Sequence, residues 1–323
     1  MILASDKKNI TYLWRRAMEQ KKAWLIYVMV FSVTIMWGLN VVMLKVLVEN
    51  LPPLTMTGFR ILLAGVTAFL IVLVMRQFER MSRKAFYYTL LGALFGVTLH
   101  HLFMAYGLTM VDASTTALIL ALVPITTALF GLLFLGELMT MMRGIGFVLA
   151  IIGVFFIQSS GLDGFSLSFG EFIIFLAMLA QAVSFIFVKK ATENVDSKQV
   201  TIVMMFAGAL GLFIISFIFE PGGLGGMLDA PWWIYVVFFL SGVVSTGAGY
   251  IIFNSGIQMI GASQTVIFNN FIPFFGVIFS VLFLGESIYV SQLFGFVFIV
   301  LGVMFGTGYI ERIYMRQRRR YLK

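Results

Sequence analysis

Polar side chains inside long apolar stretches are the residues that could do chemistry in this sequence. An unpaired polar group in hydrocarbon is costly, so such residues either bond to a neighbouring helix or contact a ligand. Interhelical packing is therefore the alternative at every such position. The residues we expect to line a substrate site are Trp37, Asn40, Arg60, His101, Tyr106, Ser184, Tyr250, Asn254, Asn269 and Asn270.

Two basic residues, Arg60 and Lys45, have no cytoplasmic loop to account for them. Either cation could meet a carboxylate or phosphate on a solute. The structural alternatives are that Arg60 extends outward or pairs with Glu49, and that Lys45 is an ordinary lysine at a helix end. An anionic or zwitterionic solute is therefore favoured over a purely cationic one.

No arrangement in the sequence is typical of catalysis or of a metal site. His100 and His101 are adjacent, and successive helix residues point about 100° apart, so the pair cannot chelate one metal ion. The chain has no cysteine, which excludes disulfides and thiolate chemistry. We therefore expect no enzyme activity, no metal and no cofactor.

Composition predicts an integral membrane protein. The chain is 61% hydrophobic and 11% charged, with a mean hydropathy of +1.02, which leaves too little polar surface for a soluble globule. Its apolar runs are long enough to cross about 30 Å of hydrocarbon as helices. We expect an all-α fold with ten transmembrane helices at roughly 24–48, 54–75, 85–108, 112–135, 140–159, 169–188, 199–219, 231–253, 263–284 and 288–310.

Basic residues concentrate in the two tails and in alternate connections between these helices, whereas the opposite connections are acidic. This asymmetry predicts a multi-pass protein of the cell membrane with both termini in the cytoplasm. It also explains the net charge of +8 better than nucleic-acid binding does. The first apolar run is too long for a signal peptide, so we expect it to be retained.

The segment from Gly107 to Ile157 recurs as Gly256 to Gly306 at an offset of about 149 positions. An odd number of helices in each half, five, makes the second half an inverted copy of the first. The expected organisation is a basic N-terminal segment, a first repeat, a second repeat and a basic tail, at 1–23, 24–160, 169–310 and 311–323.

Prolines and glutamates mark the repeat. Pro124 matches Pro273, and each should interrupt its helix, either as a fixed kink or as the hinge of a gate. Glu137 matches Glu286, and both follow Leu-Gly. Capping of the next helix is the interpretation we favour for these glutamates.

The sequence resembles a known family. Trp37-Gly-Leu-Asn40, Arg60, and the Pro…Gly-Glu segment seen in both halves are similar to the EamA domain of the drug/metabolite transporter superfamily. The resemblance implies two tandem domains, a central cavity between the halves, and alternating access. Arg60 has no basic counterpart in the second half, and Gln181 stands where the first half has Trp37, so solute contacts there must be asymmetric.

We therefore expect a secondary transporter, in the export direction, of a small organic solute such as an amino acid or metabolite. A facilitative exchanger of an anionic metabolite or nucleotide-type solute is the alternative. An intramembrane lipid-handling enzyme or a channel is the alternative of another class. Expected partners are the solute and the lipid bilayer, with no nucleic acid. A proton is a candidate coupling ion, and faces containing Gly144, Gly146 and Gly153 are compatible with a homodimer.

Overall fold

The computed structural model describes residues 2–75, 80–135, 139–158, 168–193, 195–260, 265 and 267–311, with side chains described from Trp24 onward. No strand occurs in these ranges, so the expected all-α fold is confirmed. Seven helices in the described chain are long and apolar enough to cross a membrane. Three shorter apolar helices accompany them, at Met141–Phe156, Phe271–Leu284 and Val290–Gly306.

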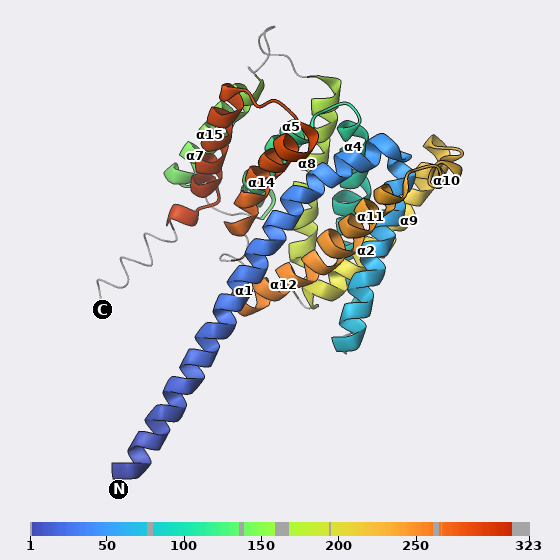
Figure 1. The fold of residues 1–323 in the computed structure, drawn as a ribbon. Helices are drawn as coiled ribbons and strands as arrows, with labels where there is room; N and C mark the ends of the chain where they lie inside the picture. The colour runs from blue at the N-terminus through green and yellow to red at the C-terminus, as the bar shows by residue number, and fades with distance from the viewer. Residues whose placement is uncertain are drawn as a thin grey trace.

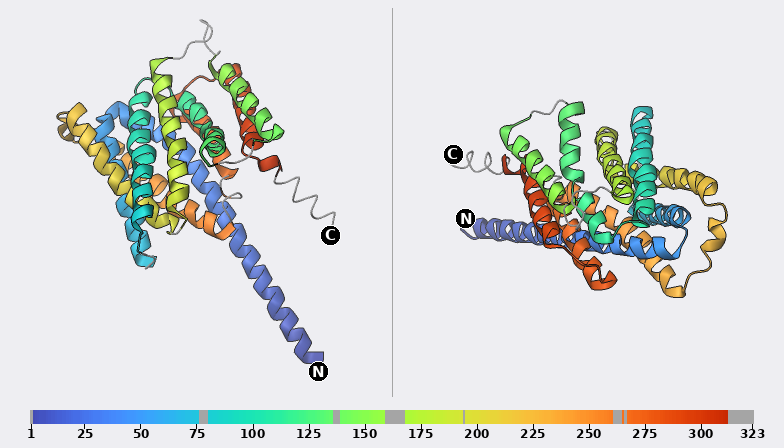
Figure 2. Two further views of the ribbon diagram at one scale, coloured as in Figure 1. Left: turned by 180° about the vertical axis from the view of Figure 1, so that it is seen from behind. Right: turned by 90° about the horizontal axis from the view of Figure 1, so that it is seen from above.

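The N-terminal half is built from long helices and two interrupted ones (Figure 1). Its elements are α1 (Ile2–Asn50), α2 (Pro53–Met75), α3 (Arg83–Ala93), η1 (Leu94–Leu99), α4 (His100–Leu108), α5 (Ala113–Leu120), α6 (Val123–Leu135) and α7 (Met141–Gln158). The N-terminal part of α1 projects away from the other helices in both views (Figure 2).

The C-terminal half contains the same kinds of element. They are α8 (Phe169–Ala191), α9 (Ser197–Phe219), α10 (Gly223–Gly226), α11 (Trp232–Phe239), η2 (Leu240–Ala248), α12 (Gly249–Ile260), η3 (Ile267–Asn270), α14 (Phe271–Phe279), η4 (Ser280–Leu284) and α15 (Val290–Gly306).

Local sequence explains where several helices start and end. α8 begins with a capping box, in which Ser168 accepts from Glu171 N and Glu171 accepts from Ser168 N. Lys189 and Lys190 lie in its last turn, where cations complement the helix dipole. Ser82 caps α3 in the same way as Ser168 caps α8, by accepting from the backbone N–H of Ala85.

Helices of the two halves pack against each other. α2 packs against α9, α3 and α4 pack against α8, and α1 packs against α14 and α12. α7 and α15 pack against each other as a separate pair at one edge of the molecule, as the views in Figure 1 and Figure 2 both show. Any movement of one half relative to the other would therefore have to break these contacts between helices of the two halves.

The two prolines lie next to helix interruptions. α5 ends at Leu120, a turn follows, and Pro124 lies in the first turn of α6. Pro273 lies in the first turn of α14, directly after the 3₁₀ turn η3. Proline lacks the N–H that a continuous helix needs, so both breaks occur where the sequence predicts them. The hinge role of these breaks stays a prediction.

Glycines allow α7 and α15 to approach at backbone distance. A Cβ on Gly153 would lie 2.7 Å from Gly295 O, and one on Gly302 would lie 2.8 Å from Ala150 N. A Cβ on Gly146 would collide with Gly306 N. The faces that contain Gly146 and Gly153, which the sequence made available to a homodimer, are thus covered by α15 of the same chain.

Candidate functional site

Arg60 of α2 is a buried cation. Its side chain is 0% exposed; Nη1 donates to Thr246 Oγ1 at 3.0 Å, and Nη2 lies 3.3 Å from His101 Nδ1. Within the described chain, Nε has no hydrogen-bond partner and the guanidinium has no ion-pair partner. The alternative that Arg60 extends outward is wrong, because its side chain is fully buried. The alternative that it pairs with Glu49 is also wrong, because Glu49 pairs with Lys45 at 3.2 Å.

A narrow crevice lies beside Arg60, between α1, α2 and α4, and has no room for a water molecule. Thr57 lies one helical turn before Arg60, and its buried hydroxyl also has no partner in the described chain. Two hydrogen-bonding groups without protein partners therefore belong to residues of one crevice. Its lining residues are Leu44, Val48, Thr57, Arg60, His101, Met104, Ala105 and Leu108.

A chain of hydrogen bonds connects Arg60 to α1 through η2. Thr246 Oγ1 donates to Ser241 O at 2.9 Å, and Ser241 Oγ donates to Asn40 Oδ1 at 2.6 Å. Trp37 Nε1 donates to the carbonyl of Ser245 at 2.8 Å. η2 is a π-helical segment, a geometry often found at functional sites. The site therefore joins α1, α2 and α4 of the first half to η2 of the second.

Aromatic rings lie beside this chain. The Trp37 ring packs against Tyr250 and Phe253 of α12, with centroids 5.1 Å and 5.0 Å away. Such an aromatic group can contact a flat or onium part of a solute. The structure therefore brings together Trp37, Asn40, Arg60, His101 and Tyr250 of the predicted site residues.

The other predicted residues lie elsewhere. Ser184 is buried and donates to Gly92 O at 3.2 Å, in the packing between α8 and α3. Tyr106 is 49% exposed near the end of α4. Asn269 lies in η3 with a buried Oδ1 that has no partner in the described chain. The side chains of Asn254 and Asn270 lie outside the described residues.

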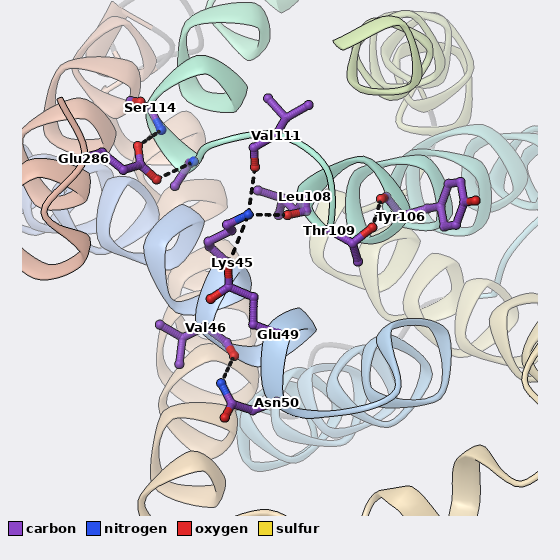
Figure 3. Close-up of polar contacts among 11 residues, drawn as sticks. Lys45, Val46, Glu49, Asn50, Tyr106, Leu108, Thr109, Val111, Ser114 and Glu286 are labelled. Atoms are coloured by element: carbon purple, nitrogen blue, oxygen red, sulfur yellow. Dashed lines mark hydrogen bonds and ion pairs between the residues drawn. The ribbon is translucent and has the colours of Figure 1, made fainter. Parts of the chain in front are cut away.

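Two carboxylates join the halves at the end of the bundle where α1 meets α2 and α4 meets α5. Glu286 accepts from Ala113 N at 2.8 Å and from Ser114 N at 2.9 Å, at the start of α5 (Figure 3). Glu220 likewise accepts from Leu54 N at 2.9 Å and from Thr55 N at 2.8 Å, at the start of α2. Each carboxylate thus caps a helix of the other half.

The expectation that Glu286 caps the helix following it is therefore wrong. The loop after η4 turns through Gly285, whose φ is +68°, and carries the carboxylate to α5 instead of α15. A positive φ of this kind is readily adopted only by glycine. Glu137, its counterpart in the first half, lies outside the described residues.

Lys45 belongs to the same end of the bundle and not to the crevice. Its Nζ donates to Leu108 O at 2.8 Å and to Val111 O at 3.1 Å, next to its ion pair with Glu49 (Figure 3). A cation at these carbonyls complements the C-terminus of α4. Burial and the nearby Glu286 raise the pKa of Asp112, and Lys45 opposes this effect.

Comparison with known proteins decides the family. The model of the EamA-like transporter family matches residues 24–159 and 168–307, which is most of the chain. The chain belongs to the EamA-like transporter family. The proposed assignment from sequence resemblance is therefore confirmed, and the protein is a membrane transporter of this family and not an enzyme.

Named relatives of this EamA-like transporter support the same conclusion. YoaV, an uncharacterised transporter of Bacillus subtilis (strain 168), is 27% identical over 88% of this chain and 97% of its own. The S-adenosylmethionine/S-adenosylhomocysteine transporter of Chlamydia trachomatis serovar L2 is 24% identical over 85% of this chain and 86% of its own. One crystal structure matches with a TM-score of 0.63 and 16% identity, covering 89% of this chain and 98% of that one.

Thr57, Ser241 and Thr246 belong to the site but are not among the residues predicted from the sequence. Thr57 carried a readable signal, because a residue three positions before Arg60 lies on the same helix face. Ser241 and Thr246 were detectable only as small polar residues in an apolar span. Their hydrogen bonds to Asn40 and Arg60 depend on which faces of α1, α2 and η2 meet.

The carboxylate caps give a first testable prediction. A Glu286→Gln variant weakens the cap on α5, the helix that follows α4, so the crevice beside α4 should open more often. A cap is worth about 1 kcal/mol, which corresponds to a roughly fivefold increase in opening. The chain has no native cysteine, so an Ala105→Cys reporter in the crevice can be labelled with a water-soluble maleimide. The labelling rate of this reporter should rise about fivefold in the Glu286→Gln variant.

Glu171→Gln is the matched control for this variant. Glu171 also caps a helix, but its own helix α8, within one half. Its loss should leave the labelling rate of the reporter unchanged. An equal rate in the Glu286→Gln variant and in the unmodified background would show that the cap does not hold the crevice closed.

Proposed function

We propose that this protein is a secondary transporter that binds the carboxylate or phosphate of a small organic solute at Arg60. The observation that carries the proposal is the fully buried guanidinium without an anionic partner in the described chain. Removing a charge from water costs several kcal/mol unless a counter-charge is supplied. A solute anion would supply that counter-charge, and the buried guanidinium would bind it.

The donors beside the crevice suit such an anion. The guanidinium fork binds carboxylate or phosphate with parallel hydrogen bonds, and its Nε is still without a partner in the described chain. The Thr57 hydroxyl, one turn away, adds a donor from the same helix. The rings of Trp37 on α1 and Tyr250 on α12 pack against each other beside η2 and form an aromatic wall outside the crevice lining, where the remainder of the solute would lie.

These features favour a zwitterionic or anionic solute with a flat or onium portion. An amino acid or its derivative has a carboxylate for Arg60 and a second group for the aromatic wall. The relative named as an S-adenosylmethionine/S-adenosylhomocysteine transporter handles molecules that combine an amino-acid carboxylate with a purine. S-adenosylmethionine is therefore one of the candidate solutes.

Transport in this proposal proceeds by alternating access between two inverted five-helix repeats, 24–160 and 169–310, with both termini in the cytoplasm. The three shorter apolar helices, added to the seven longer ones, support ten spans. The crevice between α1, α2 and α4 has no room for water, so solute entry in this proposal requires these helices to move apart. The breaks before Pro124 and Pro273 are the proposed hinges.

The proposed direction is export of a metabolite down its own concentration gradient. A facilitative exchanger of an anionic metabolite or nucleotide-type solute uses the same site and differs only in requiring solute on both sides. A channel or a lipid-handling protein would not use Arg60 as a saturable site. Saturation and exchange therefore separate these alternatives.

The test is counterflow in proteoliposomes with three labelled solutes: glutamate, phosphoenolpyruvate and S-adenosylmethionine. Thr57→Val is expected to raise the apparent KM about fivefold, because one hydrogen bond of about 1 kcal/mol is lost. Thr116→Val is its control, since Thr116 also has a buried hydroxyl without a partner in the described chain but does not line the crevice. The proposal fails if none of the three solutes exchanges.

A further inference from the structure

The hydrogen bond between Arg60 and His101 assigns the protonation of this histidine. A guanidinium can only donate, so Nδ1 of His101 must accept the bond at 3.3 Å and carries no proton. While Arg60 donates to it, His101 is therefore neutral, with its proton on Nε2. Protonation of Nδ1 would break the bond and place two cations side by side.

His100, its neighbour on α4, is fixed in the opposite way. Its Nδ1 lies 2.9 Å from the carbonyl oxygen of Ala177 on α8, so Nδ1 must carry the proton and donate. The two rings meet edge to face, with centroids 4.8 Å apart. The bond of His100 runs to backbone and is independent of Arg60, whereas the bond of His101 exists only while Arg60 points toward it.

Charged groups near His101 come from the elements packed around α4. In the described chain, no carboxylate lies within ion-pair distance of Arg60 or His101. Lys45 and Glu49 pair with each other at the far end of α4. The described titratable and charged side chains on these elements are Arg60 on α2, His100 and Tyr106 on α4, Tyr27, Lys45 and Glu49 on α1 and, in the first and last turns of α8, Glu171, Lys189 and Lys190. Tyr250 on α12 lies near Arg60.

We propose that His101 is the proton-binding residue of this transporter and takes up one proton when an anion occupies Arg60. The inference rests on the proposed solute site. A solute carboxylate would draw the guanidinium away from Nδ1 and leave that nitrogen ready to take a proton from water. The negative charge of the solute would also stabilise the imidazolium that forms.

Solute and proton therefore bind together and cross together. Linkage is reciprocal, so acid strengthens solute binding by up to about tenfold per pH unit, the limit for one linked proton. Symport of this sign drives an anion toward the alkaline side of the membrane. Export by this protein would then run only when the outward solute gradient exceeds the opposing proton gradient.

The experiment uses the full chain in proteoliposomes, with the membrane potential held at zero, and the same three labelled solutes: glutamate, phosphoenolpyruvate and S-adenosylmethionine. Counterflow at equal pH reports the solute site, and accumulation under a gradient of one pH unit, alkaline inside, reports coupling. A monoanion such as glutamate should accumulate up to about tenfold. His101→Asn keeps an acceptor for Arg60 but cannot titrate, so whatever counterflow it supports should be independent of pH and should drive no accumulation under the gradient.

His100→Asn is the matched control, because its amide can still donate to Ala177 O. It should retain both counterflow and accumulation. Counterflow without any response of the wild type to the gradient overturns the proton assignment and leaves the solute site standing. Accumulation that persists in His101→Asn, or is lost equally in His100→Asn, also overturns it. Absence of counterflow in the wild type defeats the proposed function itself. His101→Gln replaces His101→Asn if the latter does not assemble.

Discussion

Arg60→Met is expected to lower transport about 100-fold while leaving the fold intact or slightly more stable. The variant removes a guanidinium that is fully buried without an anionic partner in the described chain. Replacing such a charge with an apolar side chain of similar length removes a desolvation cost. Loss of the charge-assisted bonds to a solute, worth about 2.7 kcal/mol, should lower counterflow about 100-fold.

Lys45→Met is the matched control, because it removes a second cation from an apolar helix of the first half. Lys45 binds Leu108 O, Val111 O and Glu49, and it does not line the crevice. Its loss should lower the melting temperature and leave counterflow largely intact. The measurements are counterflow and unfolding in detergent, followed by tryptophan fluorescence. The solute site at Arg60 would be contradicted if Arg60→Met transported normally, or if Lys45→Met lost counterflow while Arg60→Met kept it.

Gly146→Ala is expected to be the most destabilising small substitution in the α7–α15 pair. An added Cβ would collide with the backbone of Gly306, which cannot move aside as a flexible side chain can. Overpacking of this kind costs about 1–3 kcal/mol, and a backbone neighbour favours the upper end. The expected result is a clearly lower melting temperature, because α7 and α15 would separate.

Gly144→Ala is the control for this substitution. It lies two residues away on the same helix, and no other part of the described chain lies within 4 Å of its added Cβ. Alanine favours a helix over glycine by about 1 kcal/mol, so this variant should be as stable as the wild type or more so. Equal destabilisation of both variants would show that the two helices are not in backbone contact at Gly146.

The two halves of the chain are joined by hydrogen bonds that could not be predicted from the sequence. Glu286 and Ser114 are 172 residues apart, yet they are joined by a hydrogen bond of 2.9 Å. The sequence predicts Glu286 as a capping residue, because a carboxylate near helix starts is typical of capping. The predicted helix is the wrong one, since the turn at Gly285 directs the side chain across the bundle.

Ser184 shows the same limit within the site itself. A serine inside an apolar span can equally bond to a neighbouring helix or face a solute, and here it donates to Gly92 O. The helices of this protein are apolar on nearly every side, so their sequences do not reveal which face meets which neighbour. His101 likewise became a proton-binding candidate only when its Nδ1 was found beside Arg60.

The sequence by itself determined the membrane environment, the all-helical fold, the family resemblance and the exceptional status of Arg60. These follow from the length of apolar runs and from the cost of a charge in hydrocarbon, both of which are local properties. Only the tertiary structure decided that Thr57, His101, Thr246 and η2 surround Arg60, that Lys45 is a structural cation, and that α15 covers Gly146. Each of these depends on the orientation of packed helices, which pairs residues far apart in the chain and leaves no periodic signal in either helix alone.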